Sequence, residues 1–250
     1  MSGSLVVVGL GPGAEAQMTP QALAAVEAAD ELFGYGPYLA RAPERDGQIR
    51  HASDNREELD RATLALQRAV AGARVAVVSG GDAGVFAMAA AVCEAMEKGP
   101  ENFRAVDFSV VPGVTAMLAV AARVGAPLGH DFCAISLSDN LKPWPLLEKR
   151  LKAAAEAGFV IALYNPISKA RPWQLGAAFE LLRTVLPVSV PVIFGRAAGR
   201  ADERITFATL GEADAGIADM ATCVIIGSAE TRTIARPGLE PLVYSPRSAR

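Results

Sequence analysis

Short apolar runs alternate along the chain with longer segments rich in alanine and leucine, and this alternation constrains the fold more than any other feature. Strands that alternate with helices are typical of α/β proteins. Runs that are apolar throughout indicate parallel strands buried on both faces, whereas the alternating RITFATL from Arg204 indicates a half-solvated or antiparallel strand. We therefore expect an α/β protein with a mainly parallel first sheet and a mixed second sheet. The expected strands are LVVVGL from Leu5, RVAVVS from Arg74, VDFSVV from Val106, FCAISL from Phe132, FVIALY from Phe159, PVIF from Pro191 and CVIIG from Cys223.

The chain has 250 residues, which is enough for two small domains with separate cores. In VVPGVTA, Pro112 and Gly113 interrupt the pattern directly after an expected strand. We place the domain boundary there, so that residues 1–112 form an N-terminal α/β domain and residues 113–250 a C-terminal one. A ligand site is expected in the cleft between the two domains.

Helix start signals lie between the strands. Thr19 followed by Pro20 matches an N-cap and a first helical residue, and it predicts a helix to about Asp30 with Leu23 and Val26 turned inward.

A second helix start is predicted where Asp54 precedes Glu57, because this spacing matches a capping box, and Gly72 should end that helix. Its apolar positions are Leu59, Leu64, Leu66 and Val70. Further helices are expected at 115–124, 145–157 and 173–186.

Composition and charge argue against several functional classes. A hydrophobic content of 51% indicates a globular chain, and a net charge of -3 without long blocks of one sign predicts no nucleic-acid partner and no membrane surface. No apolar segment reaches membrane-spanning length and no signal peptide precedes the first strand, so we expect a cytoplasmic protein. The widely spaced Cys93, Cys133 and Cys223 sit in apolar surroundings, which predicts reduced core thiols and no metal site.

The loop GLGPGAE, which starts at Gly9, fits the G-x-G-x-x-A pattern of a dinucleotide-binding turn. In such a site the glycines open directly onto a helix, but here the helix start at Thr19 comes six residues after Gly13. Asp30 and Glu31 also precede the next strand, LFGY, where a ribose contact would follow it. We therefore keep an NAD-dependent dehydrogenase only as an alternative, and interpret the loop as a stiff wall that lets a bulky ligand approach the backbone.

A second loop, VSGGDAGVFAMA from Val78, follows a strand directly. Glycine allows a ligand close to the backbone there, and the Asp82 carboxylate can accept hydrogen bonds from an ammonium group or from ribose hydroxyls. The alternative is a strand-to-helix turn in which Asp82 is the N-cap. The residues alone leave both interpretations open.

Together with four further segments, these loops resemble the tetrapyrrole methylase family, whose members transfer methyl groups from S-adenosylmethionine to corrin precursors. The four segments are PGVTA from Pro112, ALYNP from Ala162, FGRAAGR from Phe194 and ATCVIIGS from Ala221. The segments GAPLGHDFCAISLSDNLKPWPLLEKRL, LYNPISKARPWQL and DMATCVIIGSAETR resemble the branch that methylates precorrin-3B at C17. The resemblance covers nearly the whole chain. It implies two α/β domains, a homodimer, and S-adenosylmethionine bound in the cleft, with S-adenosylhomocysteine as product.

The resemblance also implies roles for individual residues. Leu10 and Pro12 would border the cleft, with Pro12 toward the substrate. The amino-acid and ribose portions of the cofactor would meet Gly80, Gly81, Asp82 and Val85, and the sulfonium would meet Thr115 and Ala116. Further cofactor contacts, largely through backbone groups, would come from Tyr164, Asn165, Arg196, Ala197, Thr222 and Val224. For these last residues the alternative is an ordinary turn at a strand end.

The implied substrate is a polycarboxylate macrocycle, and arginine pairs bidentately with carboxylates. Five arginines are candidates for binding the substrate carboxylates, and we expect one or two of them to do so: Arg41, Arg45, Arg50, Arg196 and Arg200. We place Arg41 and Arg45 in the predicted substrate site.

The stretch LGHDFCAISLSDN has polar residues at both ends of an apolar run, namely His130 and Asp131 at one end, and Ser138, Asp139 and Asn140 at the other. If FCAISL is a strand, a rise of about 3.3 Å per residue separates the ends by roughly 25–30 Å, so they cannot form one catalytic cluster. Ligands gather at the carboxyl ends of strands in open α/β sheets. We therefore assign general-base chemistry to Asp139 with Ser138, and substrate contacts to Asn140 and Lys142. For His130 and Asp131 the alternative to a function is a turn that starts the strand. For Ser138, Asp139 and Asn140 it is an N-cap cluster ahead of the helix after Pro143.

The implied reaction needs no protein nucleophile, because the sulfonium methyl is already electrophilic and needs only alignment with the ring carbon. In this branch, methylation is coupled to ring contraction, gives precorrin-4 and serves cobalamin biosynthesis, where the tetrapyrrole could be handed to neighbouring pathway enzymes. The tail YSPRSAR departs from the branch pattern, and the chain lacks the cysteine-rich domain of some cobalt-early relatives. The remaining alternatives are a sister methyltransferase for another ring carbon or for cobalt-factor III, and a tetrapyrrole carrier without chemistry.

Overall fold

The computed structural model describes residues 3–54, 57–168 and 170–248. The chain divides into two compact units, Met1–Ala116 and Met117–Arg250, which we call unit 1 and unit 2. The boundary that we expected after Pro112 lies slightly earlier in the same segment. Each unit is an α/β structure with its own five-stranded sheet, which confirms the predicted fold class.

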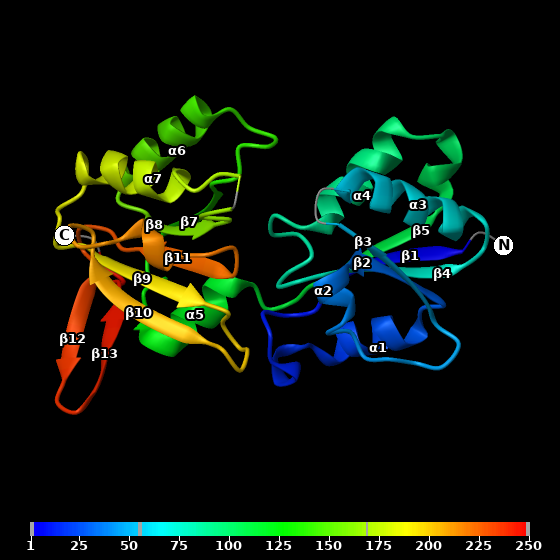
Figure 1. Ribbon diagram of the computed structural model, residues 1–250, viewed down its shortest axis with the longest axis horizontal. Helices are drawn as coiled ribbons and strands as arrows, with labels where there is room; N and C mark the ends of the chain where they lie inside the picture. Colours follow the sequence, from blue (N-terminus) through cyan, green and yellow to red (C-terminus); the bar gives the residue numbers. More distant parts are fainter. Residues whose placement is uncertain (1–2, 55–56, 169, 249–250) are drawn as a thin grey trace. The chain divides into compact units, whose positions relative to one another are not determined.

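All strand pairs in the sheet of unit 1 are parallel, as predicted, and their order is β3-β2-β4-β1-β5 (Figure 1). The strands are β1 (Ser4–Gly9), β2 (Glu31–Tyr35), β3 (Ile49–Ser53), β4 (Arg74–Ser79) and β5 (Asp107–Val111). We did not predict β3, because its sequence IRHAS is too polar to resemble a buried strand. Since the strands are parallel, their carboxyl ends lie along one edge of the sheet.

Helices cover both faces of this sheet: α3 and α4 lie on one face, and α1 and α2 on the other (Figure 1). Successive side chains of β1 accordingly enter different cores, Leu5 and Val7 that of α3 and α4, and Val8 that of α1. The helices are α1 (Pro20–Ala28), α2 (Gly36–Leu39), α3 (Glu58–Val70) and α4 (Met88–Lys98), with short 3-10 helices η1 (Glu15–Gln17) and η2 (Glu101–Ala105).

The start of α1 confirms the predicted cap, because the Thr19 hydroxyl accepts a hydrogen bond from the Ala22 backbone N–H at 3.1 Å. Val26 is buried as expected, but Leu23 is 38% exposed and Ala22 takes the inward position.

Only half of the capping box predicted for α3 is present. The Glu57 carboxylate accepts a hydrogen bond from the Asp54 backbone N–H at 3.0 Å, yet the helix begins only at Glu58. The apolar residues Leu59 and Leu64 are exposed, while alanines join Leu66 on the buried face. Small side chains allow α3 to pack closely on the sheet, which a pattern based on leucines alone does not reveal.

Unit 2 contains a mixed sheet, as predicted, in the order β10-β9-β11-β8-β7, and a three-stranded sheet in the order β12-β13-β6 (Figure 1). Its strands are β6 (Gly125–Ala126), β7 (Phe132–Ser136), β8 (Val160–Tyr164), β9 (Pro191–Arg196), β10 (Arg204–Thr209), β11 (Thr222–Ile226), β12 (Arg232–Arg236) and β13 (Leu239–Tyr244). β7 and β8 are parallel, and β11 is antiparallel to both β8 and β9. The strands β7, β8 and β9 therefore end at the same edge, where β11 begins.

The larger sheet of unit 2 is also covered on both faces, by α6 and α7 on one and by α5 on the other (Figure 1). The helices are α5 (Ala116–Val124), α6 (Trp144–Glu156) and α7 (Gln174–Arg183), with the 3-10 helix η3 (Ala215–Ile217). Gly195 on β9 admits α5 at close range, since a Cβ there would lie 2.1 Å from Cγ2 of Val120. The predicted strand from Arg204 is β10, partly exposed and antiparallel to β9, as expected.

The three cysteines are free but differ in burial. Cys223 is a core thiol, and burial raises its pKa to about 12; Cys133 is partly buried, which also raises its pKa. Cys93 is exposed on α4, so the prediction of a core position is wrong for that residue. In the described part of the chain, no helix combines the length and the apolar character needed to cross a bilayer. The same residues contain no cluster of His, Cys, Asp and Glu side chains that could hold a metal ion.

Candidate functional site

Three loops of unit 1 meet at the carboxyl ends of the neighbouring strands β4, β1 and β5. The Gly11 N–H donates to the Gly81 carbonyl at 3.0 Å, and the Gly81 N–H donates to the Gly11 carbonyl at 2.8 Å. A Cβ on Gly113 would lie 2.3 Å from the same Gly81 oxygen, and one on Gly9 would lie 2.7 Å from it. Glycine is therefore required by close backbone approach between the loops, and the glycine pattern has a local cause other than dinucleotide binding.

Asp82 ties the second of these loops to the third. Its Oδ1 accepts from the Gly84 N–H at 2.8 Å and its Oδ2 accepts from the Gly113 N–H at 2.9 Å. The alternative that Asp82 caps the next helix is wrong, because α4 begins only at Met88. An ionised carboxylate accepts about four hydrogen bonds, so capacity remains on Asp82 for donors of a ligand.

The structure brings the predicted cofactor residues of unit 1 together at this edge. Leu10 and Pro12 are buried behind the crossing of the loops, and Gly80 lies against the ring of Tyr38. A Cβ on Gly81 would lie 3.7 Å from the Thr115 Cα, which places the third loop beside the second. The predicted residues on these loops are Leu10, Pro12, Gly80, Gly81, Asp82, Val85, Thr115 and Ala116.

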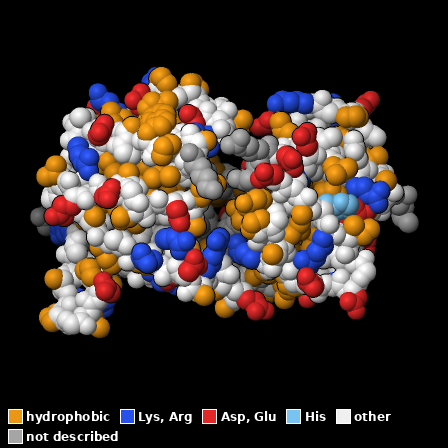
Figure 2. All heavy atoms as spheres, in the orientation of Figure 1, with side chains coloured by type: hydrophobic (Ala, Val, Ile, Leu, Met, Phe, Trp, Pro, Cys, Tyr) orange, Lys and Arg blue, Asp and Glu red, His pale blue; other side chains and the backbone are white. Residues whose placement is uncertain are grey.

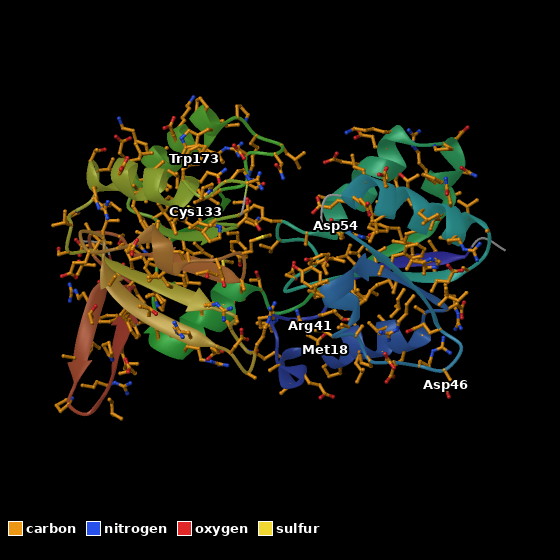
Figure 3. The ribbon with its side chains drawn as sticks, in the orientation of Figure 1. Met18, Arg41, Asp46, Asp54, Cys133 and Trp173 are labelled. Carbon is orange, nitrogen blue, oxygen red and sulfur yellow. The ribbon has the colours of Figure 1, made fainter. Side chains whose placement is uncertain are left out.

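The arginines predicted for substrate binding in unit 1 have structural partners. Arg41 donates to the Gly11 carbonyl at 2.7 Å and so supports the glycine loop (Figure 3). Arg45 donates to the Ala29 carbonyl at 2.7 Å, at the opposite edge of the sheet where β2 begins. Arg50 donates to the carbonyl of Leu39 at the end of α2 and to that of Ala42 after it. We therefore leave Arg45 and Arg50 out of the proposed substrate site.

In unit 2, Ser136 at the end of β7 joins two loops at the edge where β7, β8 and β9 end. Its hydroxyl accepts from Nδ2 of Asn165 at 2.9 Å and from the Ser138 N–H at 3.3 Å. The Lys142 ammonium donates to the Ser136 carbonyl at 3.4 Å. Burial lowers the pKa of Lys142, as does the nearby charge of Arg150. Tyr164, at the end of β8, accepts from the Met117 N–H at 3.0 Å.

Arg171 forms hydrogen bonds with the polar residues that follow β7. Its Nη1 donates to Oδ1 of Asp139 at 2.9 Å and to the Ser138 hydroxyl at 3.4 Å, and it also donates to Oδ1 of Asn140. The alternative of an N-cap cluster is wrong, because α6 begins at Trp144 with no side-chain cap. The three residues are thus held by an arginine from the loop after β8.

Among the described residues, the left-handed backbone region contains three residues other than glycine: Phe86, Asn165 and Ala197, with φ of 52°, 50° and 51°. Such conformations are unfavourable for residues with a side chain and cluster at functional sites. Two of the three are predicted cofactor residues, and Phe86 directly follows Val85. This distribution supports the loops after β4, β8 and β9 as the functional parts of each unit.

The remaining predicted residues lie on β9 and β11. Arg196 pairs with Asp219 and with Asp202, each at 2.7 Å, so its place at a strand end has a structural reason that we did not foresee. The Thr222 hydroxyl donates to Oδ1 of Asp219 at 2.8 Å. Val224 lies within the strand and its side chain belongs to the hydrophobic core. A contact between the Val224 side chain and a ligand is therefore excluded, and only its backbone remains in the prediction.

The other end of the LGHDFCAISLSDN stretch has the predicted turn. Gly129 and His130 form a bend, and the Gly129 N–H donates to the Ala126 carbonyl at 3.1 Å. The Asp131 carbonyl accepts from the Val160 N–H at 3.1 Å, which starts the pairing of β7 with β8. His130 and Asp131 therefore serve the strand, at the end away from Asp139.

Comparison with known proteins identifies the family of the chain. A family model described as Tetrapyrrole (Corrin/Porphyrin) Methylases matches residues 4–214. The chain belongs to this family. A protein from Sinorhizobium sp named Precorrin-3B C(17)-methyltransferase is 71% identical over 247 residues, covering 99% of this chain and 97% of the relative. Cobalamin biosynthesis protein CobIJ of Mycobacterium tuberculosis is 48% identical over 236 residues, which cover 93% of this chain and 46% of that protein. The crystal structure of the methyltransferase CobJ superposes with a TM-score of 0.93 at 49% identity, over 98% of this chain and 100% of that one.

Several residues of this methylase family member that shape the site were not predicted. Arg171 lies in LYNPISKARPWQL, which carried the resemblance, but an arginine in a loop has no pattern that identifies its partners. Asp219, which holds Arg196 and Thr222, is the first residue of DMATCVIIGSAETR, but a single aspartate ahead of a strand has no pattern that identifies its partners. Trp173 at the start of α7 lies edge-to-face on Trp144, with ring centroids 4.7 Å apart. Figure 2 shows hydrophobic side chains gathered over α6 and α7, and Figure 3 labels Trp173 there.

Proposed function

We propose that the protein transfers a methyl group from S-adenosylmethionine to C17 of precorrin-3B, a step of cobalamin biosynthesis, and that this transfer is coupled to ring contraction to precorrin-4. The observation that carries the proposal is the near-complete match to the Sinorhizobium methyltransferase of that name, which extends through the loops at the strand ends. The family supports a dependence on S-adenosylmethionine and a tetrapyrrole substrate.

In unit 1, the edge loops fit the amino-acid and ribose portions of S-adenosylmethionine. Glycines at positions 80 and 81 expose backbone groups, and the Asp82 carboxylate retains acceptor capacity for an ammonium group or ribose hydroxyls. Thr115 and Ala116 follow Gly113, which Asp82 holds, so a ligand that binds Asp82 also lies near them. Arg41 supports this arrangement from behind through the Gly11 carbonyl.

In unit 2, the residues proposed for the adenosine side of the cofactor offer backbone groups from strained turns. Asn165 and Ala197 hold their left-handed conformations at the ends of β8 and β9. The Asn165 side chain is fixed by Ser136, and the Ala197 N–H donates to the Ala221 carbonyl at 2.9 Å. Tyr164, Arg196 and Thr222 place these backbone segments.

The bound cofactor supplies the electrophilic methyl group on its sulfonium. Methyl transfer breaks the bond from sulfur to methyl and forms the bond from methyl to C17, and the bond electrons pass to sulfur, so no acid, base or protein nucleophile is needed for this step. The task of the protein is to hold both reactants in line at close range, which contributes several kcal/mol to catalysis (about 7 to 11 in well-oriented systems). Rigid loops with strained backbone serve that task.

Three further parts of the proposal concern the assembly and location of the protein. We propose that it is a homodimer in the cytoplasm, and that it passes its product directly to the next enzyme of the pathway. Sedimentation of the purified protein tests the first statement: a single species with the mass of one chain would contradict a homodimer.

The proposed function is tested by supplying the purified protein with precorrin-3B and S-adenosylmethionine. We expect a product one methyl group heavier, with NMR signals that place the new methyl on C17 and show the contracted ring. Isothermal titration should show S-adenosylhomocysteine binding in the micromolar range. A methyl on another ring carbon would identify a sister activity, and an unchanged macrocycle in the presence of bound cofactor would identify a carrier.

A further inference from the structure

The Arg171 side chain is partly accessible and only one of its two terminal nitrogens is occupied. Nη1 serves the three acceptors at Ser138, Asp139 and Asn140, and Nε donates to the Ser168 hydroxyl at 3.3 Å. Among the residues that the structure describes, no acceptor lies within hydrogen-bond distance of Nη2. With 21% of its side chain exposed, Arg171 can offer the two N–H groups of Nη2 to an external anion.

The backbone of Arg171 is fixed within its own loop. The Ser168 N–H donates to the Arg171 carbonyl at 3.1 Å, and the Arg171 N–H donates to the Ser168 carbonyl at 2.9 Å. These bonds and the contacts of Nε and Nη1 hold the guanidinium at both ends. A guanidinium fixed in this way loses little conformational entropy when it binds a ligand.

A second cation lies close to the same segment. Lys142 donates to the carbonyl of Ser136, two residues before Ser138, which Arg171 contacts. Two residues of extended chain span roughly 7 Å, so the two cations lie within reach of one carboxylate-bearing side chain of a macrocycle. Of the charged side chains in this contact network, Arg171 and Lys142 are positive and Asp139 is negative.

We propose that Arg171 and Lys142 form the binding site for a peripheral carboxylate of the substrate, and that Asp139 positions Arg171 and does not act as the general base. The inference rests on the proposed function for the identity of the substrate as a polycarboxylate macrocycle. Guanidinium groups pair well with carboxylates, and the ammonium of Lys142, which contacts the carbonyl of Ser136 on the same segment, adds a second positive charge near the Nη2 of Arg171. Asp139 already accepts a hydrogen bond from Arg171 at 2.9 Å, so the geometry engages its carboxylate in holding that guanidinium.

The test compares Arg171→Gln, Arg171→Lys and Asp139→Asn with Arg236→Gln as the matched control. Arg236 donates to the Glu240 carbonyl within the exposed β12–β13 hairpin, away from the loops at the strand ends. Each variant is assayed for turnover of precorrin-3B, for S-adenosylhomocysteine binding by calorimetry, and for binding of uroporphyrin III, an octacarboxylate porphyrin, by fluorescence titration.

For Arg171→Gln we expect KM for precorrin-3B and Kd for uroporphyrin III to rise by about tenfold to a hundredfold, the usual effect of losing charge-assisted hydrogen bonds. Arg171→Lys should recover part of this loss because it keeps the charge. Asp139→Asn should raise KM by a smaller factor and leave kcat within about threefold, because Ser138 and Asn140 still hold the guanidinium. Binding of S-adenosylhomocysteine should match Arg236→Gln in all variants.

Two results would overturn the inference. One is an Arg171→Gln variant with KM and porphyrin binding equal to those of Arg236→Gln; a lower melting temperature alone would then show that Arg171 only joins the two loops. The other is an Asp139→Asn variant that loses kcat with KM unchanged, which would restore Asp139 as the base. If Arg171→Gln does not fold, Arg171→Lys decides by the same two readouts. If the wild type does not convert precorrin-3B, the proposed function is rejected. If porphyrin binding nevertheless depends on Arg171, the carboxylate-binding site is supported.

Discussion

The two units build the edge at their strand ends in different ways. In unit 1 the loops after β1, β4 and β5 touch through glycine backbones, and Asp82 binds backbone N–H groups. In unit 2 the loops after β7, β8 and β9 are joined by side chains, above all Arg171 and Arg196. The charged network of unit 1, in which Glu31 pairs with Arg68 and His51, lies at the beginning of β2, at the opposite edge of its sheet.

This difference indicates how each edge responds to change. Where backbones touch, there is no room for a side chain, and the penalty of a substitution is steric. Where solvent-exposed side chains join the loops, the remaining side chains can rearrange after a substitution. The free-energy cost is then small, because water replaces the lost hydrogen bonds. Unit 1 should therefore be rigid and intolerant of substitution at its edge, and unit 2 adaptable.

The largest effect is expected for Gly113→Ala. Its Cβ would lie 2.3 Å from the Gly81 oxygen and 2.6 Å from the Gly9 oxygen, both backbone atoms that cannot move aside alone. We expect a loss of about 3 kcal/mol in the free energy of unfolding, at the upper end for overpacked sites, with loss of S-adenosylhomocysteine binding. Urea unfolding and calorimetry measure the two effects.

Gly36→Ala is the matched control for this substitution. A Cβ on Gly36 meets no atom within 4 Å, and the residue begins the helix α2. Alanine favours the helix over glycine, so stability should stay equal or rise by up to about 1 kcal/mol. Equal losses at Gly113 and Gly36 would show that the glycines of unit 1 are not required by backbone contact.

Much of the fold could be predicted because burial leaves a periodic pattern. Strands such as β1 and β4 are apolar throughout, and the Thr19 cap marks the start of α1. The pattern fails where it is weak: β3 is an edge strand of mixed polarity, and the buried face of α3 consists largely of alanine. Alanine carries little hydrophobic signal, although it is what allows a close helix.

The candidate site divides in the same way. The roles of Gly80, Gly81, Asp82, Asn165 and Ala197 came from the family resemblance, since the residues alone left the loop at Asp82 open between a ligand site and an ordinary turn. The partners of these residues could not be predicted. Arg171 lies 32 residues from Asp139, and no local pattern connects them. Val224 lies in a matching segment, but its side chain belongs to the hydrophobic core, so only a contact through its backbone remains a prediction.

A smaller effect is expected for Glu31→Gln, which tests the charged network of unit 1 away from the loops. Glu31 is 3% exposed, and hydrogen bonds from Arg68 and then His51 lower the pKa of its carboxyl even though burial raises it. We expect a loss of about 2 kcal/mol in the free energy of unfolding at neutral pH. Because the pKa is lowered by folding, this contribution is present above the unfolded value of about 4.3 and is lost as the pH falls through the folded value. The difference between wild type and variant should therefore shrink below about pH 4 in unfolding measured as a function of pH.

The neighbouring Asp30→Asn serves as control, since Asp30 pairs with Arg74 while 44% of its side chain is exposed. Hydrogen bonds from Arg74 lower the pKa of Asp30 to about 2, so its pH dependence has the same sign as that of Glu31. Solvent screens this pair, and we expect little change in stability at neutral pH. A gap between wild type and Glu31→Gln that is constant from neutral to strongly acidic pH would contradict the assignment to the Glu31 charge.

The smallest effect is expected for Arg196→Gln in unit 2. The guanidinium pairs with Asp202 and Asp219, which raises its pKa and lowers that of Asp202, but all three side chains are at least 36% exposed. Water can replace these pairs, so the melting temperature should fall only slightly. If the cofactor meets this segment through the backbone at Ala197, the Kd of S-adenosylhomocysteine should rise by less than about threefold, as for loss of one exposed ion pair. Arg200→Gln is the control, because Arg200 is exposed and, unlike Arg196, forms no ion pair within 4 Å with a carboxylate of the described residues. A tenfold weaker affinity for Arg196→Gln alone would mean that its guanidinium contacts the cofactor, and that the edge of unit 2 binds ligand through side chains as well as joining its loops through them.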